Sequence, residues 1–307
     1  MKLGLGLPQS GTMNLHTDVV KIAKAAEDAG FTSLWTFERV LVPVAPTQGL
    51  YNIPGVPWPD WYQHAADGLT VLTAAAAVTS TVRLGTSVLV VPLRVPAELA
   101  RTLATLDLIS GGRVIAGFGS GWSVDEYNAT GADFEGRGRA LDETIDVCRA
   151  VWGPDPVTVK GARALIDNAN VGPKPGRQIT IMLGGGWSDR AVDRIARRSD
   201  GWLAAGTPGP ALKAGWDQIR ERAAAHGRDA GALELIARGN IELTDAPLGA
   251  DRQPFQGSLD QVVEDFVGNA EAGATELLIE LQGTVRDADE LFDRALEIKD
   301  RLAAAGI

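Results

Sequence analysis

The 307-residue chain contains a single cysteine, Cys148, so no disulfide bond can form within it. Although 45% of the residues are hydrophobic, no run approaches the roughly 18 apolar residues that a membrane span requires. The N-terminal residues MKLGLGLPQSG lack the apolar core of a signal peptide. The net charge of −10 disfavours a nonspecific nucleic-acid surface. The composition therefore predicts a cytoplasmic globular protein with no nucleic-acid or membrane partner.

Side chains that bind metals or act as nucleophiles are also scarce. Of the three histidines, His16 and His64 lack a carboxylate at metal-ligand or triad spacing, and His226 falls at a helix end on the opposite face. Residues 119–121 lack the G-x-S-x-G spacing of a nucleophile elbow. Cys148 lies on an apolar helical stripe, which favours packing over chemistry. The sequence predicts neither a metal site nor a catalytic nucleophile.

A strand–helix–strand unit is clearest between residues 82 and 122. Residues 82–91 are rich in β-branched side chains, which is typical of a buried strand. Residues 97–110 carry apolar side chains at helical spacing, with Ile109 as the last member of the stripe. Residues 114–118 form a second apolar run that ends in a glycine-rich loop. Two parallel strands joined by a helical crossover make a βαβ unit.

The same alternation recurs along the whole chain. Strands are expected at residues 3–7, 32–37, 82–91, 114–118, 179–183, 201–205, 233–243 and 276–281. Helices are expected at residues 18–29, 68–80, 97–110, 139–152, 189–198, 210–225, 262–270 and 291–302. Eight such units predict a (β/α)8 TIM barrel that spans residues 1–307 as a single domain. A doubly wound sheet would require a Rossmann fingerprint after the first strand, and residues 7–11 do not form one.

Two insertions interrupt the regular pattern. Residues 38–62, after the second strand, contain five prolines and the aromatic residues Tyr51, Trp58, Trp61 and Tyr62. Because long aromatic loops in compact domains are usually functional, this segment is expected to form a lid or wall over a pocket, with a dimer contact as the competing interpretation. Residues 153–177, before the fifth strand, are expected to carry a small hairpin.

The active site of such a barrel lies at the carboxyl ends of its strands. Two glycine-rich turns, at residues 119–121 and 184–186, follow predicted strands. Backbone N–H groups can approach an anion closely at such turns, and Ser188 would cap the helix that follows the second one. A tight turn with no ligand fits the same spacing. A phosphate-binding turn, aromatic walls and few acid–base groups together indicate a bound cofactor.

Several segments resemble the luciferase-like (β/α)8 oxidoreductases, in particular the actinobacterial subgroup that uses the deazaflavin coenzyme F420. The resemblance extends over nearly the whole chain. It rests on SLWTFERVLVP (33–43), VRLGTSVLVVPLRVPAELARTLATLDLISGGRV (82–114), GFGSGWSVDEYNATG (117–131), RGRALDETIDVCRAVW (137–152), ITIMLGGGWSDRAV (179–192) and SDGWL (199–203).

The resemblance implies that a flavin-type ring lies across the barrel mouth. The ring would rest on a bulge at the end of the third strand, where a non-prolyl cis peptide is typical. Glu38 would hydrogen-bond the pyrimidine edge of the ring, and residues 184–186 would bind phosphate. The implied cofactor-binding residues are Glu38, Thr86, Ser87, Val88, Gly119, Ser120, Gly121, Asp125, Gly184, Gly185 and Gly186.

The chain also departs from the family pattern. Relatives that oxidise a sugar phosphate carry a histidine after the acidic residue and a glutamate after the glycine loop, as base and acid. This chain has Arg39 and Trp122 there. Arginine stays protonated and indole only donates, so neither is a usable base at neutral pH. Sugar-phosphate oxidation is therefore disfavoured, and an apolar substrate with a carbonyl or carboxylate group is favoured.

The expected function is hydride transfer between reduced F420 and such a substrate, most readily as a reductase. The expected catalytic residues are Arg39, His64 and Trp122, with solvent, His64 or Tyr127 delivering the proton. Trp58, Trp61 and Tyr127 are expected to bind the substrate, and a homodimer is expected. An FMN-dependent monooxygenase with a partner reductase, and a cofactor-binding protein without catalysis, are the alternatives.

Overall fold

The computed structural model describes residues 1–185 and 188–307. In this part of the chain, eight parallel strands close into a barrel through the pairing of β3 with β5, which confirms the predicted TIM barrel. The barrel strands are β1 (Lys2–Gly6), β2 (Ser33–Thr36), β3 (Arg83–Thr86), β5 (Val114–Gly119), β8 (Thr180–Gly184), β9 (Gly201–Ala205), β10 (Glu234–Asn240) and β13 (Glu276–Glu280).

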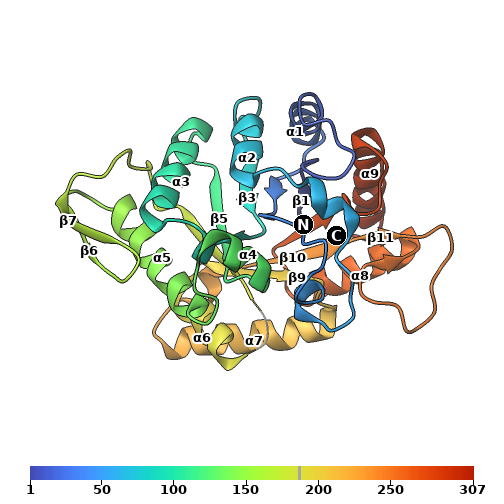
Figure 1. The fold of residues 1–307 in the computed structure, drawn as a ribbon. Helices are drawn as coiled ribbons and strands as arrows, with labels where there is room; N and C mark the ends of the chain where they lie inside the picture. Colours follow the sequence, from blue (N-terminus) through green and yellow to red (C-terminus); the bar gives the residue numbers. More distant parts are fainter. Residues whose placement is uncertain (186–187) are drawn as a thin grey trace.

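Helices cover the outside of the barrel, and Figure 1 shows them as a ring around the strands. They are α1 (Asp18–Asp28), α2 (Gly68–Ala76), α3 (Pro96–Ser110), α5 (Arg137–Trp152), α6 (Asp189–Arg198), α7 (Gly209–Ala225), α8 (Leu259–Glu271) and α9 (Ala288–Ala304), with the short α4 (Val124–Thr130) after β5. Serine caps the starts of α6 and α8, and the cap at Ser188 is the one predicted from the sequence. Ser188 accepts a hydrogen bond from the Ala191 N–H, and Ser258 with Gln261 forms a capping box.

The remaining elements lie outside the regular barrel. The predicted hairpin in the second insertion is the antiparallel pair β6 (Val157–Lys160) and β7 (Leu165–Ala169), which projects from the barrel in Figure 1. Short 3₁₀ turns are η1 (Leu50–Asn52), η2 (Asp60–His64), η3 (Val91–Leu93) and η4 (Ala230–Ala232). No helix among the described residues is long and apolar enough to cross a membrane.

Three local predictions were wrong. The strand expected at 82–91 divides into β3 and β4 (Leu89–Val90), because the chain bulges between them. The strand expected at 233–243 ends at Asn240, and residues 242–243 form β11 (Glu242–Leu243), which pairs with β12 (Gln256–Gly257). Ile109 is 53% exposed, because Ser110 is the buried residue of the last α3 turn and hydrogen-bonds the Arg113 N–H.

Inside the barrel, a layer of apolar side chains fills the space below the mouth. The layer consists of Trp35, Ile115, Met182, Leu203, Ile236 and Leu278, and Val88 packs against it. Filling by side chains makes the barrel interior a core rather than a pore. Between the barrel and its helices lies a larger core that contains Cys148, where burial raises the pKa of the thiol. The described part of the barrel interior therefore leaves no room for a ligand below its mouth.

On the opposite face of the barrel, Glu27 near the end of α1 fixes the segment that enters β3. Its carboxylate accepts hydrogen bonds from the backbone N–H groups of Ser80 (2.9 Å), Thr81 (2.6 Å) and Val82 (3.1 Å). Burial alone would raise the pKa of Glu27, but these bonds outweigh burial and lower the pKa to about 2. The stabilisation is therefore present above the usual carboxyl pKa and is lost as the pH falls toward 2.

We expect Glu27→Gln to lower the free energy of unfolding at pH 7 by about 1–2 kcal/mol, because a charged acceptor of several bonds is replaced by a neutral one. The difference between wild type and variant should shrink as the pH falls from about 4.5 to about 2. Urea unfolding at several pH values measures this difference. Asp28→Asn, at an exposed position whose carboxylate pairs with Lys24 at 3.5 Å, is the matched control and should change stability little. A constant Glu27→Gln difference across this pH range would contradict the assignment.

Candidate active site

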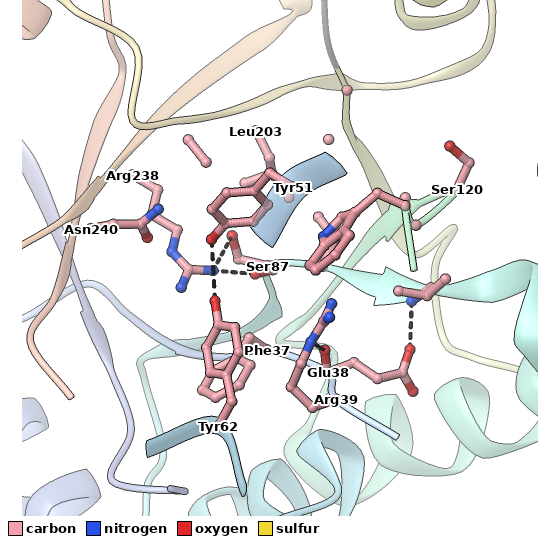
Figure 2. Close-up of a pocket in the computed structure, with 18 of the residues that line it drawn as sticks. Phe37, Glu38, Arg39, Tyr51, Tyr62, Ser87, Ser120, Leu203, Arg238 and Asn240 are labelled. Carbon is pink, nitrogen blue, oxygen red and sulfur yellow. Dashed lines mark hydrogen bonds between the residues drawn. The ribbon is translucent and has the colours of Figure 1, made fainter. Parts of the chain in front are cut away.

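A cavity of about 450 Å³ opens at the carboxyl ends of the barrel strands. Ten of the residues predicted for the site line it, namely Glu38, Arg39, Ser87, Val88, Gly119, Ser120, Gly121, Trp122, Gly184 and Gly185. The others are Phe37, Tyr51, Tyr62, Val90, Leu203, Ala205, Thr207, Arg238 and Asn240. Figure 2 shows their side chains converging on one space. Residues 38–62 contribute four of these side chains, so the first insertion is a wall of the cavity, as predicted.

Arg39 lies in this wall and is occupied by its neighbours. Its Nε donates to the Glu38 backbone oxygen at 2.7 Å, and one terminal nitrogen pairs with the Glu126 carboxylate at 3.2 Å. Its guanidinium carbon lies 5.2–5.8 Å from the ring centres of Trp58, Tyr62 and Trp122. This distance range is typical of cation–π contacts. Burial raises the pKa of Glu126, although Arg39 opposes that shift.

The first turn of α4 fastens the insertion in place. Glu126 accepts from the Val40 N–H at 2.8 Å, and Asp125 accepts from the backbone N–H and the hydroxyl of Thr47 at 2.9 and 2.6 Å. Gln48 accepts from the Val124 N–H at 2.9 Å. Asp125, which the resemblance placed beside the cofactor, therefore binds the loop and does not line the cavity. The wall is held by both polar bonds and aromatic packing.

We expect Arg39→Met to loosen this wall, because it removes the cation that three rings and Glu126 surround. The free energy of unfolding should fall by about 2–3 kcal/mol, and limited proteolysis should cut within residues 38–62 faster than in wild type. Arg39→Lys keeps the positive charge but loses the planar guanidinium group. Its stability and its rate of proteolysis should lie between those of wild type and Arg39→Met. If Arg39 instead served only to bind substrate, stability and proteolysis would remain at wild-type values.

Glu38 lines the cavity, but its carboxylate is engaged within the protein. It accepts a short hydrogen bond from the Val90 N–H, visible in Figure 2, and pairs with Arg94, whose Nε lies 2.6 Å away. Arg94 also binds Asp67 at 2.9 Å. Burial would raise the pKa of Asp67, but hydrogen bonds from Arg94 and Thr70 lower it overall. Glu38 thus ties β2 to β4 as well as facing the cavity.

Arg238 on β10 is a second buried cation at the cavity, opposite Arg39 in Figure 2. One terminal nitrogen donates to the Ser87 carbonyl oxygen, and the other lies 3.4 Å from the Glu280 carboxylate. Its Nε has no hydrogen-bond partner within the described ranges. Glu280 in turn accepts from the side chain of Gln282 at 2.9 Å. The bulge between β3 and β4 is therefore supported from across the barrel.

The floor of the cavity is shaped by Val88, which sits on this bulge. The Ser87–Val88 peptide bond is cis, as the resemblance implied. A Cβ atom added at Gly119 would lie 2.6 Å from a Val88 methyl group, and one added at Gly184 would lie 2.9 Å from the other. Because Gly119 and Gly184 have no side chains, the two turns provide the space that the Val88 side chain fills. This steric role exists whether or not the turns bind a phosphate.

Several predicted site residues are not brought into the cavity. His64 is exposed and lines a separate surface pocket together with Trp61. Trp58 is part of the wall but does not line the cavity, and its ring centre lies 4.7 Å from that of Trp122. The hydroxyl of Tyr127 donates to the Ser120 carbonyl oxygen from a buried position. His64 and Tyr127 are thus poorly placed to deliver a proton in the cavity.

Two further predictions concern residues next to the floor. Thr86 bonds both the carbonyl oxygen (2.9 Å) and the N–H (3.0 Å) of Gly117 through its hydroxyl, so it joins β3 to β5 and does not line the cavity. Gly186 lies outside the described residues.

Arg238, Asn240 and the hydroxyls of Tyr51 and Tyr62 are site features that sequence reasoning missed. Residues 233–243 were expected to form one continuous strand, so its end was placed beyond Asn240. A signal was nevertheless present, because an arginine inside an apolar barrel strand needs a buried partner or a ligand. Within the described part of the chain, no group of three or more His, Cys, Asp or Glu side chains could hold a metal ion.

A parallel eight-stranded barrel with its cavity at the carboxyl ends of the strands is the architecture of TIM-barrel enzymes. Residues 5–303 match the model of the luciferase-like monooxygenase family, and the chain belongs to this family. Its members are oxidoreductases or monooxygenases.

Curated relatives in this family differ in cofactor. The FMNH2-dependent dimethylsulfone monooxygenase of Pseudomonas fluorescens is 32% identical over 67% of this chain and 52% of its own. The F420-dependent glucose-6-phosphate dehydrogenase of Amycolatopsis mediterranei is 30% identical over 64% of this chain and 55% of its own. The chain spans 65% of an uncharacterised Mycobacterium tuberculosis relative that is 33% identical. A solved monooxygenase from Streptomyces bottropensis shares the fold, with a TM-score of 0.80 at 20% identity over 99% of this chain and 100% of that one.

Proposed function

We propose that this protein is an F420-dependent oxidoreductase that transfers hydride between the reduced deazaflavin and a mostly apolar substrate with a carbonyl group. The observation that carries the proposal is that Arg39 and Trp122 are packed together and are not available as base and acid. They occupy the positions where sugar-phosphate-oxidising relatives carry the base and the acid. Arg39 is paired with Glu126 and packed against three rings, one of them Trp122. Oxidation of an alcohol by these two residues lacks a proton acceptor.

The size and the floor of the cavity support a planar cofactor of this kind. Its volume of about 450 Å³ lies within the usual range of small-molecule sites. Gly119 and Gly184 leave the floor around Val88 free of other side chains, so a flat ring could approach the backbone there. Ser87 and Val88 would support the ring, and Ser120 with Gly121 would lie beside its side chain. When bound, the cofactor would supply hydride.

The cofactor phosphate has a matching position in this proposal. Gly184 ends β8 and Gly185 follows it at the cavity, and Ser188 caps the N-terminus of α6. Unpaired N–H groups and the dipole at a helix N-terminus favour an anion. The aromatic side chains of Phe37, Tyr62 and Trp122 line the cavity and would exclude water from an apolar substrate. These features support a bound phosphorylated cofactor, and they suit FMN as well as F420.

An FMN-dependent monooxygenase is the second candidate, favoured by the identity of 32% with the dimethylsulfone monooxygenase. Titration of the purified protein with F420 and separately with FMN, followed by cofactor fluorescence, distinguishes the two. Micromolar or tighter binding of F420 with weak binding of FMN is the expected result. Preference for FMN, with oxygen uptake when the flavin is reduced, would replace the first proposal by the second. Binding of neither cofactor would overturn both.

A further inference from the structure

Two tyrosine hydroxyls meet at the cavity. The Oη atoms of Tyr51 and Tyr62 lie 3.2 Å apart, and both side chains line the cavity (Figure 2). Tyr62 is only 7% exposed, whereas Tyr51 is 47% exposed. The pair therefore links the outer surface of the 38–62 wall to a buried hydroxyl inside the cavity.

The surroundings of Tyr62 hold its proton in place. Burial raises the pKa of Tyr62, and Tyr51 raises it further, while the cations Arg39 and Arg238 oppose the shift. The hydroxyl therefore stays protonated at neutral pH. Its ring packs against Phe37 at 5.6 Å between centres. Tyr62 is thus a protonated donor near two positive charges, which would stabilise the negative charge left on its own oxygen after it gives up the proton.

Other acid–base groups at the cavity are committed elsewhere. Glu38 binds Arg94 and the Val90 N–H, and Arg39 and Arg238 are paired with carboxylates. Among the titratable side chains that line the described cavity, the two tyrosines are those not in an ion pair. A carbonyl reduction needs a proton for the oxygen as well as a hydride for the carbon.

We propose that Tyr62 is the catalytic acid of this site and that Tyr51 relays protons to it from solvent. The inference rests on the proposed function. The carbon of the substrate carbonyl gains a hydride, with its two electrons, from a reduced deazaflavin or flavin, and the π electron pair moves to oxygen. The Tyr62 O–H bond breaks as the O–H bond of the product alcohol forms. Tyr51 returns a proton to the Tyr62 oxygen, and water restores Tyr51. The substrate is reduced and the cofactor oxidised by two electrons.

The test compares Tyr62→Phe and Tyr51→Phe with wild type, each loaded with reduced F420 and given acetophenone, benzaldehyde and cyclohexanone. Cofactor dissociation constants and melting temperatures are measured on the same samples, because a purely structural role would move these. Tyr62→Phe should lower kcat on the order of 10²-fold or more, with the cofactor dissociation constant within about twofold of wild type. Tyr51→Phe should lower kcat less, about tenfold, and added imidazole should restore its rate without changing that of wild type.

Each alternative outcome would overturn a specific part of the inference. Wild-type rates in Tyr62→Phe, or a loss that only parallels weaker cofactor binding, would overturn the role of Tyr62 as acid. No rescue of Tyr51→Phe by imidazole would overturn the relay. If wild type binds F420 but reduces none of the three carbonyl compounds, the inference fails while cofactor binding stands. If wild type binds neither F420 nor FMN, the proposed function fails with it.

Discussion

Replacing Arg238 by methionine should cost the protein about 3–5 kcal/mol of its free energy of unfolding. The reason is that Glu280, 5% exposed, would lose the cation facing it and stay buried as an uncompensated charge. Glu280 has little room to turn away, since a Cβ atom added at Gly6 would lie only 2.6 Å from its carboxylate. The Ser87 carbonyl oxygen would also lose the donor that supports the cavity floor. Cofactor affinity should therefore fall at least about tenfold, equivalent to 1.4 kcal/mol.

The double variant Arg238→Met/Glu280→Gln separates these two losses. Removing the carboxylate charge should restore most of the stability, because no buried charge is left unpaired. Cofactor affinity should stay low, because the Ser87 carbonyl still lacks its donor. Urea unfolding and fluorescence titration measure the two quantities. As a control, Arg252→Met breaks the Arg252–Asp265 ion pair outside the cavity. It should lower the free energy of unfolding and leave cofactor affinity unchanged. Wild-type cofactor affinity in Arg238→Met would show that Arg238 only balances charge.

The barrel could be predicted because its signals are local. Each strand is a short apolar run, each long helix carries an apolar stripe, and some helices begin with a capping residue, as at Ser258 with Gln261. Such patterns depend on neighbours within one or two turns. The errors arose where a residue far away decides the outcome. The run at 82–91 gives no sign that Arg238, about 150 positions later, holds the chain at Ser87 between two strands.

The sequence predicted where the candidate site lies, but it predicted less of how the charged side chains of the site are paired. The rule that barrel sites lie at strand ends, together with the family resemblance, selected ten residues that do line the cavity. It left Arg39 with a free charge, because nothing near position 39 reveals Glu126 on α4 as its partner. The resemblance likewise placed Asp125 beside the cofactor, and His64 was expected to deliver a proton, although Asp125 binds Thr47 and His64 lies on the outer surface. Long-range pairing of charges is set by tertiary packing, which periodicity does not report.

The role of a glycine also depends on residues that are far away in the sequence. Of the substitutions discussed, Gly117→Ala should have the largest effect on stability. A Cβ atom at Gly117 would lie 1.7 Å from the Thr86 carbonyl oxygen and 2.7 Å from a Leu203 methyl carbon. The first clash is with backbone inside a closed barrel, so no side-chain rotation relieves it. We expect a loss above about 4 kcal/mol, or no folded protein. Thermal and urea unfolding measure it. Gly268→Ala, in α8 with nothing within 4 Å, is the control and should stabilise the protein by about 0.5–1 kcal/mol.

Variants at two neighbouring glycines divide the steric role from the phosphate role. The close contact of Gly184→Ala is with the Val88 side chain at 2.9 Å, and the Leu203 carbonyl oxygen at 3.8 Å is at ordinary contact distance. Gly184→Ala should therefore cost about 1–3 kcal/mol and be relieved by Val88→Ala, whereas Gly117→Ala should not be relieved by it. At Gly185 a Cβ atom would have its nearest neighbour at 3.7 Å, which is ordinary contact. Gly185→Ala should therefore leave stability unchanged. A loss of affinity for F420 or FMN in that variant would mean that the turn binds the cofactor, and unchanged affinity would mean that cofactor binding does not depend on Gly185.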